Sequence, residues 1–129
     1  MSDYVLDASA VLVLLNQEPG SEVVEEALSG EATVMNAVNY TEVVSKLASV
    51  GMPPKTIAGA LEPLGLTVQH HDRAVAEQAG LLYPATHRQG LSLGDRSCLA
   101  LAKSLKLPAL TADKAWVGLD IGVKVKLVR

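Results

Sequence analysis

Short apolar segments alternate with helical patterns along the chain. Tyr4–Leu6 predicts a short buried strand, and the almost wholly apolar segment Ala8–Leu15 directly after it predicts a helix. Strands of a parallel sheet are short and continuously apolar, because helices cover both faces of the sheet. The alternation therefore predicts an α/β sandwich with a mostly parallel central sheet.

The same patterns divide the rest of the chain into further elements. Short apolar or alternating runs predict strands at Ala32–Met35, Leu66–Gln69, Ala109–Thr111 and Val123–Val128. Apolar residues at helical spacing predict helices at Ser21–Leu28, Tyr40–Val50, Thr56–Leu61, Asp72–Tyr83 and Asp95–Leu105. No repeat or flexible linker divides the 129 residues, so we expect residues 1–129 to form a single domain.

Several classes of function are disfavoured by the residues that the chain lacks. Cys98 is the one cysteine, which excludes an intramolecular disulfide and a cysteine-based zinc site, and we interpret it as a small buried hydrophobe. His70 and His71 are adjacent and His87 is distant, so no zinc-ligand spacing exists and we interpret all three as surface or packing residues. The chain has no Phe, three Tyr and one Trp, which argues against aromatic stacking platforms for single-stranded nucleic acid.

The net charge of −3 conceals an uneven distribution along the chain. Residues 1–62 carry nine acids and two bases, whereas residues 63–129 carry five acids and nine bases. This asymmetry favours an anionic partner, and a chance imbalance on solvated faces is the alternative. The apolar run 8–15 is too short to span a bilayer and no basic leader precedes it, so we expect a cytoplasmic protein with no membrane contact.

Four acidic residues follow the predicted strands or lie early in the helices behind them. They are Asp7, Glu42, Asp95 and Asp113. Ligands bind outside the carboxyl ends of parallel strands, so we expect all four acids at one edge of the sheet. Carboxylates crowded together repel one another unless a cation lies between them, and oxygen ligands suit Mg²⁺ or Mn²⁺. Asp7 also lies between two apolar elements, where an unpaired carboxylate is costly and capping the next helix is the one alternative role.

Helix capping is the alternative interpretation for the other three acids. Asn39-x-x-Glu42 and Ser92-x-x-Asp95 resemble capping boxes, and Asp113 suits the N-cap of the turn that follows it. The helix dipole also favours acids near helix N-termini. For any one of the three considered alone, capping is the simpler explanation.

Taken together and in this order, these segments resemble the PIN domain, and they are closest to the VapC type of small ribonuclease toxin. The matching segments are Asp7-Ala8-Ser9-Ala10, Asn39-Tyr40-Thr41-Glu42, Leu93-Gly94-Asp95-Arg96 and Thr111-Ala112-Asp113-Lys114-Ala115-Trp116. The resemblance covers essentially the whole chain. It implies a parallel three-layer α/β/α sandwich.

The resemblance also implies roles for individual residues. Asp7, Glu42 and Asp95 match the most regular metal-binding acids of the family, and Asp113 matches a more variable fourth. Together this quartet would bind Mg²⁺ or Mn²⁺. The hydroxyls that support the first and last acids are matched by Ser9 and Thr111.

The activity implied by the resemblance is that of a metal-dependent endoribonuclease. A metal-activated water would attack the phosphodiester and leave 5′-phosphate and 3′-hydroxyl ends. Cations must surround the acids if RNA is to approach them, and Lys46, Arg96 and Lys114 are the candidates for phosphate contacts. Local ion pairing, such as Glu42 with Lys46 one turn later, is the alternative for these cations.

By the same resemblance, the protein would be a toxin that a cognate antitoxin neutralises, and it would form a homodimer. The apolar helices near the N-terminus and around Thr56–Leu61 would supply a dimer face or a groove for an antitoxin helix. The alternative is that these helices pack only within the monomer.

Three rival functions remain to be weighed. A PIN-like module that has become a non-catalytic binding or scaffold protein is disfavoured because all four acids are present. A receiver-type domain needs an acceptor Asp after the third strand, where this chain has His70-His71. A haloacid-dehalogenase-like phosphatase needs Asp-x-Asp after the first strand, and the chain has Asp7-Ala8-Ser9 there.

Overall fold

The computed structural model describes residues 3–30 and 33–129. Five strands form one sheet in the order β3-β2-β1-β4-β5, and every neighbouring pair is parallel. The strands are β1 (Tyr4–Leu6), β2 (Thr33–Asn36), β3 (Thr67–Gln69), β4 (Ala109–Thr111) and β5 (Val125–Leu127). The predicted α/β fold with a parallel central sheet is therefore confirmed.

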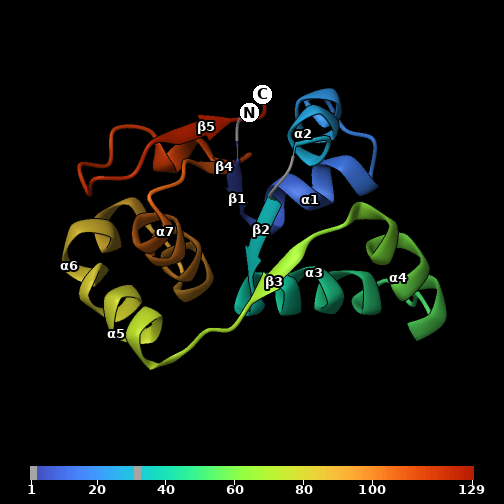
Figure 1. Ribbon diagram of the computed structural model, residues 1–129, viewed down its shortest axis with the longest axis horizontal. Coiled ribbons are helices and arrows are strands. Elements are labelled where there is room, and N and C mark those ends of the chain that lie inside the picture. Colours follow the sequence, from blue (N-terminus) through green and yellow to red (C-terminus); the bar gives the residue numbers. More distant parts are fainter. Residues whose placement is uncertain (1–2, 31–32) are drawn as a thin grey trace.

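Helices cover both faces of this sheet, as Figure 1 shows, with α5 to α7 on one side and α1 to α4 on the other. They are α1 (Ala8–Leu15), α2 (Ser21–Leu28), α3 (Ala37–Ser49), α4 (Pro54–Leu61), α5 (Arg73–Leu81), α6 (Tyr83–Thr86) and α7 (Leu93–Leu105). Single 3₁₀ turns occupy Glu62–Leu64, His87–Gln89 and Lys114–Trp116. Within the described residues, no helix is long and apolar enough to cross a bilayer.

Two apolar cores lie on the two faces of the sheet. Successive strand residues point to opposite faces, so Val5 packs into one core and Leu6 into the other. The first core joins β1, β2 and β4 to α5 and α7, and the fully buried Trp116 and Cys98 belong to it. The second core joins the same strands to α1, α2, α3 and α4. The acids that follow β1 and β4 thus emerge from strands that are anchored on both sides.

Several element boundaries differ from the sequence predictions. Helix α3 begins at Ala37, three residues earlier than predicted, because the side chain of Asn36 caps it by accepting from the Val38 N–H at 2.8 Å. Helix α7 begins two residues early because Ser92 is its N-cap. Strand β2 begins at Thr33, and the predicted first residue, Ala32, lies outside the described residues.

The predicted helix over residues 72–83 is also shorter than expected. Asp72 caps α5 by accepting from the Val75 N–H at 2.9 Å, and the helix ends at Leu81. Helix α6 then begins anew at Tyr83, with Pro84 in its first turn. Proline has no N–H to donate to the preceding turn, so it interrupts one helix and suits the start of the next. Strand β5 is limited to three of the six residues predicted for it.

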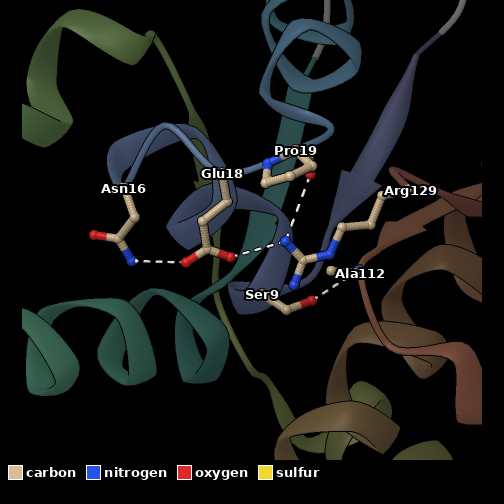
Figure 2. A network of polar contacts seen from close by, with 6 residues as sticks. All are labelled: Ser9, Asn16, Glu18, Pro19, Ala112 and Arg129. Atoms are coloured by element: carbon tan, nitrogen blue, oxygen red, sulfur yellow. Dashed lines mark hydrogen bonds and ion pairs between the residues drawn. The ribbon is translucent and has the colours of Figure 1, made fainter.

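The residues after β5 contact the loop between α1 and α2. Arg129 donates from Nη1 to Glu18 Oε1 at 2.9 Å and to the Pro19 carbonyl at 3.5 Å (Figure 2). Gly20 follows with a φ of +101°, and a Cβ there would overlap the carbonyl oxygen of Val128. Only glycine suits both the backbone conformation and this close approach.

Candidate active site

The carboxyl ends of β1 and β4 meet in the middle of the sheet. The N–H of Asp7, directly after β1, donates to the carbonyl of Leu110 in β4 at 2.9 Å. β1 lies between β2 and β4, so the chain leaves it toward one neighbour and returns beside the other. Crevices that bind ligands form at such a switch point in open α/β sheets.

Asp7 is a buried carboxylate, with 4% of its surface exposed. Its Oδ2 accepts hydrogen bonds from Ser9 Oγ at 2.7 Å and from Thr111 Oγ1 at 2.9 Å. Burial raises the pKa of Asp7 from 3.8 to about 6, against the two hydroxyls, which lower it; the carboxylates of Asp95 and Glu42 raise it further. Asp7 occupies the N-cap position of α1 but its side chain makes no capping bond, so the capping interpretation of Asp7 is wrong.

Ser9 and Thr111 join the ends of the two strands. The Ser9 and Thr111 hydroxyls lie 3.1 Å apart, and Ser9 Oγ accepts from the N–H of Ala112 at 3.0 Å (Figure 2). Thr111 Oγ1 accepts from the N–H of Asp113 at 3.1 Å. One short network of hydroxyls therefore fixes both Asp7 and the backbone that carries Asp113.

Glu42 lies on the exposed side of α3, and a buried amide orients it. The fully buried Asn39 donates from Nδ2 to Glu42 Oε1 at 2.9 Å and to the Gly94 carbonyl at 2.8 Å. The interpretation of Asn39 and Glu42 as a capping box is wrong, because the N-cap of α3 is Asn36 and Asn39 lies inside the helix. The Asn39 amide instead links α3 to the start of α7.

Gly94 makes room for the carboxylate of Glu42. A Cβ built on Gly94 would lie 2.6 Å from Glu42 Cδ, and closer still to one of the carboxylate oxygens. Glycine here is required by the close approach of a side chain from another helix, since its own φ is not positive.

Asp95 stands in the first turn of α7 and forms the predicted capping box. Asp95 Oδ2 accepts from the Ser92 N–H at 2.8 Å, and Ser92 Oγ accepts from the Asp95 N–H at 3.2 Å. Burial raises the pKa of Asp95; the two bonds from Ser92 lower it, Asp113 raises it and Arg96 lowers it. Asp95 is therefore both a cap and a member of the acidic cluster, so the two interpretations of this residue do not exclude each other.

Asp113 is exposed and caps the turn that follows β4. Its Oδ1 accepts from the N–H of Ala115 at 2.9 Å, which confirms the capping interpretation of this residue. Its charge nevertheless contributes to the raised pKa of Asp95. The four acids are thus connected electrostatically, through Asp7 with Glu42 and Asp95 and through Asp95 with Asp113.

The donor chemistry of this cluster fits a hydrated divalent cation. Across residues 3–30 and 33–129, no three His, Cys, Asp or Glu side chains are close enough to form a ready-made metal site. Hydrogen bonds from neighbouring protein groups hold the carboxylates instead. Mg²⁺ in proteins is usually bound by only one or two carboxylates and keeps several waters. The buried Asp7 and the acids that repel it are therefore suitable ligands for this cation.

The three predicted cationic contacts have different surroundings. Lys46 is exposed beside Glu42, and Lys114 is exposed beside Asp113. Arg96 turns away toward α5 and α6, where Nη1 donates to the Ala79 carbonyl at 3.3 Å and the guanidinium lies 5.2 Å from the centre of the Tyr83 ring.

Glu42 and Lys46 do not form the alternative local ion pair. Among the described residues, neither Glu42 nor Lys46 takes part in an ion pair, whereas Arg73 pairs with Glu77 and Arg129 with Glu18. The charges of Lys46 and Lys114, the two cations beside the acids, are thus not neutralised by a local ion pair.

Sequence reasoning missed two residues that organise the site. The spacing of Asn39 and Glu42 predicts a cap, whereas the Asn39 amide links Glu42 to α7. Gly94 stood in a motif without a role, and its position beside an expected catalytic acid was the signal available in the sequence.

Comparisons with known proteins agree on one family. The sequence profile of the PIN domain matches residues 4–121. No curated protein sequence matches significantly. Among solved structures, a DNA-bound VapBC from Salmonella typhimurium is similar to this chain with a TM-score of 0.76 and 16% identity, covering 100% of both chains.

Two further structures show the same fold. A toxin–antitoxin complex from Klebsiella pneumoniae has a TM-score of 0.74 at 17% identity, covering 98% of both chains. VapC20 from Mycobacterium tuberculosis, described as a toxin that cleaves the sarcin–ricin loop, has a TM-score of 0.71 at 14% identity and covers 95% of this chain and 99% of its own.

Proposed function

The chain belongs to the PIN domain family, and we propose that it is a metal-dependent endoribonuclease that serves as the toxin of a toxin–antitoxin pair. One observation carries this proposal. Asp7 is a buried carboxylate at the carboxyl edge of the sheet, and Glu42 and Asp95 raise its pKa further. A protein that keeps such a repulsive arrangement has a use for a bound cation.

In this proposal Asp7, Glu42, Asp95 and Asp113 hold the metal. A divalent cation bound there would polarise a phosphoryl oxygen of the RNA and lower the pKa of a bound water, which is the chemistry that hydrolysis needs. Ser9 and Thr111 fix the orientation of Asp7 by donating to its Oδ2.

Other groups of the chain would orient the acids and bind the RNA. Asn39 orients Glu42, and the Ser92 backbone N–H orients Asp95. Lys46 and Lys114 contact neighbouring phosphates in this proposal, since RNA must approach past the acids. We retain Arg96 only as a contact that requires its guanidinium to leave the Tyr83 ring.

The expected partners follow from the similar structures. The Klebsiella and Salmonella structures are a toxin–antitoxin complex and a VapBC bound to DNA, and VapC20 is described as a toxin that cleaves the sarcin–ricin loop. We propose RNA as the substrate, an antitoxin protein as the inhibitor and a homodimer as the active form. We also propose that residues 1–129 act as one nuclease unit.

Asp7→Asn tests the proposed function directly. Incubated with total RNA and Mg²⁺ or Mn²⁺, the wild-type protein should cleave. Cleavage by Asp7→Asn should fall by more than the about 10–100-fold loss typical of a group that only supports a metal ligand. Asp120→Asn, which changes an exposed acid outside the site, is the matched control and should retain activity. A wild-type protein that binds an antitoxin but cleaves no RNA with either metal would instead be a catalytically silent binding module.

A further inference from the structure

A groove of about 730 Å³ lies between α3 and the start of α7, next to the acidic cluster. Its volume is within the range of small-molecule sites. Apolar side chains, hydroxyls and one catalytic candidate line it, among them Val38, Thr41, Glu42, Ser45, Leu93 and Gly94.

The groove is continuous with the proposed active site. Glu42 and Gly94 belong to both, because the Glu42 carboxylate lies against Gly94. The fully buried Asn39 donates to Glu42 and to the Gly94 carbonyl, so it fixes the two residues that the groove shares with the acidic site. An occupant of the groove therefore lies beside whatever binds at the acids.

The lining has an apolar side and a hydroxyl side. Leu93 is 60% exposed although it is a large aliphatic residue, so its side chain adds little to the core and faces solvent in the first turn of α7. Thr41 and Ser45 lie along α3 with the Thr41 hydroxyl donating to the Ala37 carbonyl, which leaves its oxygen free to accept. The described residues that line the groove include no aromatic side chain.

We propose that this groove binds the nucleobase adjacent to the phosphate that is cut, with Leu93 against the face of the base and the hydroxyls of Thr41 and Ser45 at its edge. This inference rests on the proposed function. Unstacked bases present an apolar face and a polar edge, and proteins read their sequence through hydrogen bonds to that edge. Lys46, which also lines the groove, supplies a positive charge for the next phosphate, so the chemistry fits a continuous RNA strand.

The four homopolymeric RNA octamers test the proposal by binding. Their affinities are measured on Asp7→Asn protein, which leaves the RNA intact, in the presence of Mg²⁺. We expect the Asp7→Asn protein to bind one of the four octamers more tightly than the other three. Adding Leu93→Ser to this protein should weaken its affinity for the preferred octamer about tenfold. Adding Thr41→Val should reduce the difference in affinity between that octamer and the other three.

Leu81→Ser is the matched control, because Leu81 is 70% exposed on α5 and does not line the groove. It should leave all four affinities unchanged. Sedimentation of each variant gives a second readout. Unchanged affinities in Leu93→Ser overturn the proposal, and if that variant also loses its dimer, the groove is an interface between copies of the chain.

The outcome for the groove is separate from that for the proposed function. Base-selective binding that depends on Leu93 supports the groove even if the wild-type protein cleaves no RNA. Cleavage that is normal in Leu93→Ser and has the wild-type base preference overturns the groove and leaves the proposed nuclease intact. No binding to any octamer also overturns the groove.

Discussion

Asp7 and Glu42 both reach the carboxyl edge of the sheet, but the protein holds them in opposite ways. Asp7 follows a central strand, is buried and accepts bonds from two hydroxyls. Glu42 extends from the outer side of α3, and one amide and the absence of a side chain at Gly94 set its position.

This difference separates two ways of placing a charge. Asp7 is buried in surroundings that disfavour its ionised form, so the ionised carboxylate reduces the stability of the metal-free fold. Glu42 is exposed, and the position of its carboxylate depends on the space that a neighbouring helix provides at Gly94. Changes around the buried Asp7 should therefore affect stability as well as activity, whereas changes around the exposed Glu42 should affect mainly activity.

The largest expected effect is the pH dependence of the metal-free protein. The pKa of Asp7 is about 6 in the fold against an ordinary value of 3.8, so the folded state binds more protons than the unfolded state between these values. Stability should therefore fall as pH rises from about 4 to about 6, by up to about 3 kcal/mol at about 1.4 kcal/mol per pKa unit. Denaturant unfolding in EDTA measures it, and Asp7→Asn should lose this part of the slope. Equal slopes in both proteins would contradict the assignment to Asp7.

Thr111→Val should have the next largest effect. The variant keeps the shape of the side chain but removes the donor to Asp7 and the acceptor of the Asp113 N–H. Losing a partner of a buried charged group costs about 1–3 kcal/mol. Thr67→Val, at an exposed position of β3, is the control for the same chemical change. If urea unfolding gives the two variants equal stability, the hydroxyl network does not support Asp7.

Gly94→Ala should reverse the pattern, with a loss of activity and little loss of stability. The added methyl displaces the flexible end of Glu42, whereas alanine is the better helix former by about 1 kcal/mol. We expect cleavage to fall about 10–100-fold, as when a metal ligand loses its support.

Gly80→Ala provides the control for this change, because a Cβ at Gly80 meets nothing within 4 Å. It should be stabilised by the same helix preference and should keep full activity. If Gly94→Ala cleaves RNA as the wild type does, the placement of Glu42 against Gly94 is irrelevant to function.

The smallest effect is expected at Asp113. It is exposed, and asparagine would cap the Lys114–Trp116 turn as well as aspartate does. Asp113→Asn should lower the cleavage rate less than tenfold and leave the melting temperature unchanged. A loss as large as that of Asp7→Asn would place Asp113 among the principal ligands.

The sequence allowed the fold to be predicted because its signals are local. Short apolar or alternating runs identify the strands, and Ser92 and Asp113 cap the elements that follow them, as predicted. The site needed information that no local pattern contains. Asn39 looked like a cap, and its contacts with Gly94, 55 positions away, depend on the packing of α3 against α7.

The parallel pairing of β1 with β4 has a consequence for the timing of synthesis. Asp7 takes its hydrogen bonds from Ser9 nearby and from Thr111, which lies 104 positions later in the chain. Chains are synthesised from the N-terminus, and contacts between distant segments form only when both are present. A nascent chain thus carries Asp7 early but lacks one of the two hydroxyls that orient it until Thr111 has emerged. In the proposed nuclease, the hydroxyl network that orients Asp7 therefore forms only after Thr111 has been synthesised.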